Sequence, residues 1–183
     1  MPEYGWIQTA SGRKVFPLSL RPADVYLADI AHSLSNQCRF TGHTKWHYSV
    51  AQHSILVSLH CDPAVAMWGL LHDASEAYLS DIPRPLKALP GFGDVYLAAE
   101  RVAMDAVCDH FGLSHGMPAS VEHADREALA TEKRDVMGPE PEAWMPMPDP
   151  WRERIKRWSP ARAEREFLGR YFDIVAGMVY NGH

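Results

Sequence analysis

The sequence predicts a mostly α-helical fold, a compact helical bundle that carries a small β-hairpin at its N-terminal end. Apolar residues recur at helical spacing through most of the 183 residues, and this spacing is typical of amphipathic helices. Glycines and prolines divide the periodic stretches from one another, as expected for separate helices joined by turns. A short alternating segment near the N-terminus predicts the hairpin.

The predicted elements follow one another without internal repeats. Residues 7–18 alternate around Ser11 and Gly12, which suit the turn of a hairpin. Helices are expected over residues 29–38, 49–59, 63–79, 95–111, 121–136 and 160–178. Pro63 suits the first position of its helix, Gly112 closes the fourth, and Ser120 is expected to cap the fifth. The double-proline stretch 81–87 interrupts the helical pattern, and residues 138–150, with five prolines, are expected to form a loop.

Composition predicts one globular domain over residues 1–183, because 46% of residues are hydrophobic and no composition break divides them. We divide this domain into a hairpin extension (1–20), a metal-binding helical core (24–136), a proline-rich loop with a basic segment (138–158) and a C-terminal helix (159–183). The net charge of −5 argues against nucleic-acid binding. Three widely spaced cysteines suit free thiols in the cytoplasm, and neither a signal peptide nor a membrane span is evident.

The most informative feature is the pair His72-Asp73, which lies inside an apolar, helix-forming run from Trp68 to Tyr78. Both side chains are good ligands for a divalent metal, and burying either without a partner would cost several kcal/mol. Neighbours on a helix point about 100° apart, so both can reach one ion lying against that helix. Glu76 follows one turn later on the face of His72. The run therefore predicts a metal-dependent hydrolase in which Glu76 is the acid or base.

The remaining ligands must come from other helices. His53 lies amid apolar residues on the preceding helix, and Asp125 lies on a later one. Two histidines and two aspartates suit one ion of Mn, Co, Fe, Ni or Zn, and these mixed donors do not separate the metals. Competing candidates are His43 and His47 for the first position, Asp105, Asp109 and Asp135 for the last, and His110 and His115 for a second ion.

The order of His53, His72-Asp73 and Asp125 resembles the HD-domain phosphohydrolase superfamily, across residues 29–136. Three segments carry a closer resemblance to the YfbR-type 5'-deoxynucleotidases and to the DatZ-type dATP triphosphohydrolases. They are Cys38-Arg-Phe-Thr-Gly-His43, Tyr48-Ser-Val-Ala-Gln-His-Ser54 and the string from His72 to Lys87, which contains Asp-Ile-Pro-Arg-Pro-Leu-Lys. The resemblance implies an HD-domain helical bundle.

For the reaction, the resemblance implies hydrolysis of 5'-(deoxy)nucleotides, in which water activated by the ion attacks a phosphorus atom and a nucleoside is released. The alternative is a dATP-directed triphosphohydrolase that releases triphosphate. The same resemblance gives Glu76 the catalytic role, lets Asp81 position the sugar and water, and places Arg39 on the phosphate. Phe40 stands where the YfbR-type enzymes have a tryptophan that contacts the sugar or base. Lys87 is a second phosphate candidate, because a cation must neutralise the phosphate charge.

A candidate of a different class is a non-catalytic HD module that senses nucleotides. Loss of Glu76 would be expected of such a module, so its presence favours the enzyme. The basic segment 151–158 suits a solvated face, a steering surface for anions or a subunit contact. The preceding loop, with Trp144, Met145 and Met147, is an apolar surface of the kind that packs on a second subunit in a homo-oligomer.

Overall fold

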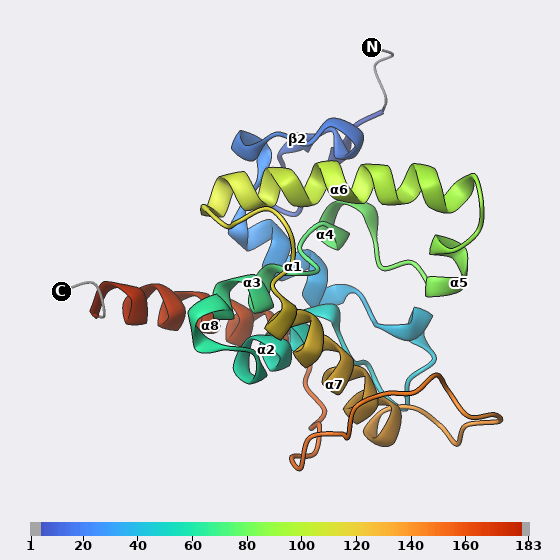
Figure 1. Cartoon of the computed structure of the whole chain (residues 1–183). Helices are drawn as coiled ribbons and strands as arrows, with labels where there is room; N and C mark the ends of the chain where they lie inside the picture. The colour runs from blue at the N-terminus through green and yellow to red at the C-terminus, as the bar shows by residue number, and fades with distance from the viewer. Residues whose placement is uncertain (1–4, 181–183) are drawn as a thin grey trace.

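The computed structural model describes residues 5–180, and these form a mostly helical molecule with one small antiparallel sheet (Figure 1). Strand β1 (Ile7–Gln8) pairs with β2 (Lys14–Val15), and Ile7 lies opposite Val15. This arrangement confirms the predicted fold class and the hairpin around Gly12. The longer helices are α1 (Leu27–Asn36), α2 (Val50–His60), α6 (Phe92–Phe111), α7 (Ala119–Asp135) and α8 (Pro160–Tyr180).

Helix α2 is the centre of the fold, because it packs against α1, α3 (Ala66–Leu71), α7 and α8. Its residues Val50, Ala51 and Val57 are fully buried, and Ser49 caps its start by accepting the backbone N–H of Gln52. Helix α6 runs across one end of the molecule, above the other helices in Figure 1. It contacts α4 (Glu76–Leu79) and α5 (Arg84–Lys87). A polar side chain on the inner face of α2 therefore lies at the middle of the bundle.

The expected helix over residues 63–79 is wrong, because the chain breaks it into a short 3₁₀ turn (Pro63–Val65), α3 and α4. Residues 72–75 form a tight turn, in which the N–H of Ala74 bonds to Leu71 and that of Glu76 bonds to Asp73. The His72 ring donates its Nδ1–H to the carbonyl of Gly69 at 2.8 Å. That carbonyl would otherwise accept the N–H of Asp73 in a continuous helix, so the side chain competes with the helix.

The expected cap of a later helix is also corrected, whereas the double-proline stretch does interrupt the helical pattern after Leu79. Helix α7 begins after Pro118, so Ser120 lies inside the helix and does not cap it. Residues Arg84–Lys87 form the short helix α5, because a proline in the first turn removes no helical hydrogen bond. Gly112 ends α6 in the left-handed conformation with φ 68°, as the sequence predicts. None of the described helices is long and apolar enough to cross a bilayer.

Residues 138–150 form a long segment without helix or strand, as predicted. It follows α7 and leads into the segment 151–159 that joins α8 (Figure 1). Residues 1–4 of the predicted hairpin extension and residues 181–183 after the last helix lie outside the described residues.

Candidate metal centre

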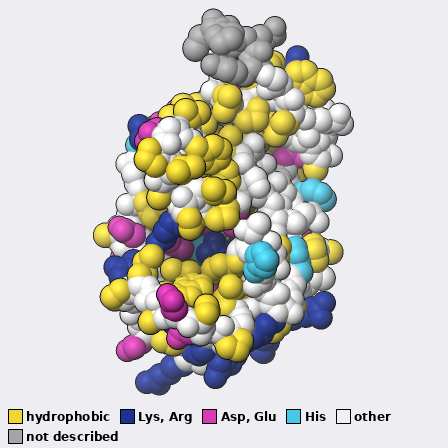
Figure 2. Space-filling view, turned by 90° about the vertical axis from the view of Figure 1, so that its right-hand side faces the viewer, with side chains coloured by type: hydrophobic (Ala, Val, Ile, Leu, Met, Phe, Trp, Pro, Cys, Tyr) yellow, Lys and Arg dark blue, Asp and Glu magenta, His cyan; other side chains and the backbone are white. Residues whose placement is uncertain are grey.

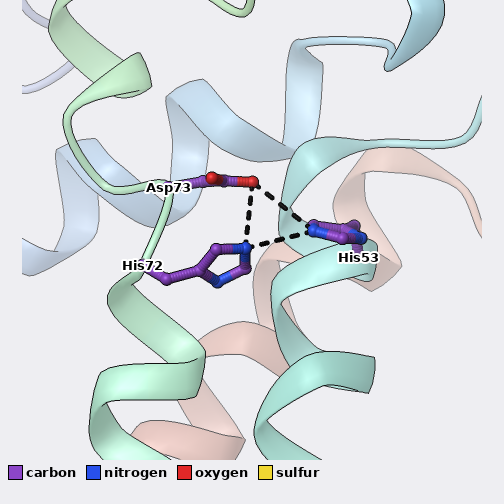
Figure 3. Close-up of side chains that lie close together, drawn as sticks. All are labelled: His53, His72 and Asp73. Carbon is purple, nitrogen blue, oxygen red and sulfur yellow. Dashed lines mark hydrogen bonds and ion pairs between the residues drawn. The ribbon is translucent and has the colours of Figure 1, made fainter. Parts of the chain in front are cut away.

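The turn between α3 and α4 aims His72 and Asp73 at α2 (Figure 3). The close approach of α3 to α2 requires glycine at position 69, because a Cβ there would lie 2.8 Å from the Cys61 sulfur and 2.9 Å from Cα of Ser58. His72 and Asp73 thus lie on a turn and not on the continuous helix that the sequence predicts. The turn still brings their side chains together beside α2.

His53 meets this pair from α2, where its side chain is fully buried. Its Nε2 atom lies 3.1 Å from Nε2 of His72 and 3.5 Å from Oδ2 of Asp73, and Nε2 of His72 lies 3.3 Å from the same Oδ2 (Figure 3). Asp125, on α7, places its Oδ1 atom 3.1 Å from Nε2 of His53 and 4.0 Å from Nε2 of His72. Three separate parts of the chain thus bring four ligand atoms together.

The hydrogen bonds on the far side of each ring show that these atoms suit a cation. His53 Nδ1 lies 2.7 Å from the Glu132 carboxylate, and His72 Nδ1 faces the Gly69 carbonyl. Each Nδ1 must therefore carry a proton, so in the neutral ring each Nε2 presents a lone pair to the cluster. Ligands about 2.1 Å from one ion lie about 3.0 to 3.4 Å apart at octahedral or tetrahedral angles. The distances of 3.1, 3.5 and 3.3 Å among His53, His72 and Asp73 are close to this range and suit one ion, whereas Asp125, 4.0 Å from Nε2 of His72, lies farther out.

The charges of the cluster lead to the same conclusion. Burial disfavours the charged form of His72, but the carboxylates of Asp73 and Asp125 outweigh it and raise the His72 pKa to about 9. Burial likewise opposes the ionised Asp125, while the two imidazoles lower its pKa to about 2. The site therefore attracts positive charge, which a proton or a divalent ion can supply. The buried His53, His72 and Asp73 cluster could hold a metal ion.

Glu132 is the residue of this centre that sequence reasoning missed. It is fully buried and accepts hydrogen bonds from the Tyr48 hydroxyl at 2.9 Å, from His53 Nδ1 at 2.7 Å and from the Arg39 guanidinium at 3.1 Å. A carboxylate behind a ligating histidine fixes its tautomer and its orientation. One signal pointed to it, because Glu132 follows Asp125 by two helical turns and so shares its face of α7.

Glu76 lies beside the cluster, at the start of α4, and is 5% exposed. Its Oε1 atom is 3.5 Å from the Lys87 ammonium, while its Oε2 atom is buried without a hydrogen-bond partner. Burial, followed by the charges of Asp73 and Asp81, raises the Glu76 pKa to about 9. The carboxyl group can therefore hold a proton at neutral pH.

Arg39, Asp73, Glu76 and Asp125 line one cleft of about 820 Å³. This volume is typical of small-molecule sites. The predicted substrate-binding residues Phe40, Asp81 and Lys87 also line it. Figure 2 shows charged side chains in a hollow whose edges are largely hydrophobic.

No family model matches the chain. The uncharacterized protein YfdR of Escherichia coli (strain K12) is 43% identical to it over 132 residues, which are 72% of each of the two chains. The uncharacterized protein RCAP_rcc00048 of Rhodobacter capsulatus is 35% identical over 171 residues, which are 88% of this chain and 79% of the relative. The chain belongs to the family of YfdR. Neither relative's name carries an activity, so the chemistry of this YfdR-family site is argued from its geometry.

In this YfdR-family chain, the rival ligands lie elsewhere or have other partners. His47 faces the Ser35 carbonyl at 3.1 Å, and His110 faces that of Pro22 at 2.8 Å. His115 lies between Asp105 and Asp109 on the surface, 3.0 Å from each. Asp135 is bound by Arg134, Arg154 and the backbone of Ile155. His43 is exposed.

The two predicted phosphate cations are both engaged with carboxylates. One guanidinium nitrogen of Arg39 lies 3.5 Å from Asp73, and its Nε is buried without a partner. Lys87 donates to Glu100 at 2.8 Å as well as approaching Glu76. A phosphate in the cleft would therefore compete with Asp73 and Glu132 for the Arg39 guanidinium, and with Glu76 and Glu100 for the Lys87 ammonium.

Backbone strain is concentrated beside the cleft. Phe40 and Thr41 both have φ 54°, and Ser80, which precedes Asp81, has φ 73°. Such values are costly for residues with a side chain and cluster at functional sites. The Ser80 carbonyl accepts the Tyr96 hydroxyl at 2.7 Å, and Ser80 N–H bonds to Glu76. These bonds hold the chain in the conformation that turns Asp81 into the cleft.

Proposed function

We propose that this chain is a metal-dependent phosphohydrolase of the HD-domain type that hydrolyses 5'-nucleotides, with deoxynucleotides as the leading class. The carrying observation is that ligand atoms of His53, His72, Asp73 and Asp125 converge at a cleft beside Glu76, a buried carboxyl with a free oxygen. The resemblance of residues 38–54 and 72–87 to YfbR-type enzymes supports the choice of substrate.

The two histidines and two aspartates would hold one divalent ion, and Mn, Co, Fe, Ni and Zn all suit these donors. Such an ion polarises a phosphoryl oxygen and lowers the pKa of water toward neutrality. Arg39 neutralises phosphate charge from the wall of the cleft. Asp81 orients the sugar and the attacking water.

Glu76 supplies the proton to the leaving oxygen, because its raised pKa keeps the carboxyl protonated at neutral pH. Lys87, which is itself paired with Glu100, contacts the Glu76 side chain at the edge of the cleft. A divalent ion would offset the charge of Asp73 and so lower the Glu76 pKa from this raised value. A group poised near the working pH is the most effective proton donor.

The test is a turnover panel with metal-stripped protein. Co, Mn, Zn and Mg are added back singly with deoxynucleoside mono-, di- and triphosphates, and the products are separated by chromatography. We expect metal-dependent release of phosphate from the monophosphates. Glu76→Gln should lower the rate of hydrolysis about 10²- to 10⁴-fold while the protein still binds metal. Asp73→Asn should lose both hydrolysis and metal binding. Glu122→Gln, an exposed carboxylate on α7, is the matched control.

The products decide between the alternatives. Release of triphosphate from dATP would show that the enzyme is a triphosphohydrolase and not a 5'-nucleotidase. Nucleotide binding without turnover under any metal would overturn the proposal in favour of a sensor.

A further inference from the structure

The segment 138–150, for which the proposed function has no role, forms part of the cleft. Trp144 and Met145 line it together with Arg39, Glu76 and Asp125. The sequence indicated a subunit contact for this loop. In the structure, the half-buried indole of Trp144 lines this cleft, and its ring centroid lies 6.3 Å from that of Phe40.

The cleft has two chemically different parts. Its charged part consists of Asp73 and Asp125 from the candidate metal centre, with Arg39, Glu76, Asp81, Arg84 and Lys87. Its apolar part comes from four separate segments, and the residues are Phe40, Ile82, Pro83, Pro85, Leu129, Trp144 and Met145. A molecule that fills both parts has an anionic end and a flat apolar end.

The segment is fixed at its two ends. Lys133 on α7 pairs with Glu140 near the start, and Trp151 at the end bonds through its N–H to Thr131 at 2.9 Å. The Trp151 ring also stacks on His60, with centroids 3.7 Å apart. Between these anchors, the described backbone of residues 138–150 makes no hydrogen bond to other backbone. The anchored ends place Trp144 at the cleft, while the middle can adjust to a ligand.

Side-chain contacts hold Trp144 and its neighbour in position. The Lys133 ammonium lies 5.8 Å from the centre of the Trp144 ring. Met145 approaches Arg84 of α5, with 3.6 Å between the guanidinium nitrogen and the sulfur. The segment and α5 therefore meet at the cleft, although 61 residues separate them in sequence.

We infer that Trp144 binds the aromatic base of the nucleotide and so determines which phosphoesters this site accepts. The inference rests on the proposed function for the identity of the substrate. Stacking of a base on an aromatic side chain tolerates every base, since each presents a π face. The loop would thus select nucleotides over sugar phosphates.

The two products of the proposed reaction test this without any turnover. Calorimetry with the full-length, Mn-loaded protein measures the affinity for deoxyadenosine and, separately, for inorganic phosphate. In Trp144→Ala we expect deoxyadenosine to bind about tenfold more weakly, with phosphate affinity unchanged. Trp144→Phe should restore most of the affinity. Trp6→Ala, which removes a 52% exposed tryptophan outside the cleft lining, should change neither.

Equal affinity of wild type and Trp144→Ala for deoxyadenosine, or no binding by the wild type, would overturn the inference. A parallel loss of phosphate affinity would also overturn it, because the substitution would then act on the whole site. These outcomes leave the hydrolase proposal intact if the turnover panel shows release of phosphate. Trp144-dependent binding of deoxyadenosine without hydrolysis of any nucleotide would instead reject the hydrolase and retain the base site.

Discussion

Glu132 is a buried charge that links the candidate metal ligand His53 to Arg39 and Tyr48. Replacing it by glutamine keeps the shape but removes the charge that holds the His53 proton on Nδ1. Changes behind a ligating histidine typically cost 10- to 100-fold in metal affinity. We therefore expect Glu132→Gln to weaken Mn binding by about 10- to 100-fold, measured by competition with a chromogenic chelator.

Tyr48→Phe is the control for that change, because it removes one hydrogen bond to Glu132 and leaves the contact with His53. Its metal affinity should fall less than that of Glu132→Gln. A lower melting temperature in Glu132→Gln with unchanged metal affinity would show that Glu132 stabilises the fold but has no role in metal binding.

Individual site residues differ in how visible they are in the sequence. His72 and Asp73 stand out because charged groups are rare inside an apolar run. Glu132 does not, because residues 119–135 are rich in charge and its burial depends on α7 packing against α2. The place of Trp144 is equally hard to predict, because the local sequence does not show whether an apolar loop contacts a second subunit or the cleft of its own chain.

At the level of elements, Asp135 joins the end of α7 to the segment before α8. Its carboxylate accepts bonds from Arg134 at 2.7 Å and from the backbone N–H of Ile155 at 2.9 Å. Burial alone would raise the Asp135 pKa, but these hydrogen bonds outweigh it and lower the pKa. The stabilisation is therefore present above the unfolded pKa of about 3.9 and is lost as the pH falls below it.

Asp135→Asn should accordingly lower the free energy of unfolding by about 2 kcal/mol at pH 7, measured by urea unfolding. The difference from wild type should shrink as the pH falls from 5 to 3. Asp149→Asn, an exposed aspartate of the preceding loop, should change stability little at either pH. A difference that stays constant with pH would mean that the carboxylate charge contributes nothing.

Element boundaries were predictable where a local signal acts alone. Gly112 ends α6 because a left-handed residue is needed there, and Ser49 begins α2 as a cap. The expected single helix over 63–79 failed because the His72 side chain takes the Gly69 carbonyl, an interaction that hydrophobic periodicity does not reveal. At the start of α7, the helix begins at Ala119 directly after Pro118, so Ser120 lies in its first turn and no side chain caps the start.

At the scale of the whole molecule, the candidate ligands come from α2, the turn after α3, and α7, which pack on one another. Sequence order alone cannot give this meeting point, because 72 residues of chain separate His53 from Asp125. An ion held there would join these parts in the folded state, whereas the unfolded chain offers no such arrangement. Binding to the folded state alone stabilises it by mass action.

Thermal unfolding in chelator and in increasing Mn measures this coupling. At 100 times the dissociation constant, the ion should add about 2.7 kcal/mol to the free energy of unfolding, which raises the melting temperature by several degrees for a domain of this size, about 2–4 °C per kcal/mol. Asp73→Asn and Asp125→Asn should reduce the shift. Asp105→Asn, which changes an aspartate outside the cluster, should keep it. An equal shift in all four proteins would place the ion somewhere other than the junction of α2, α3 and α7.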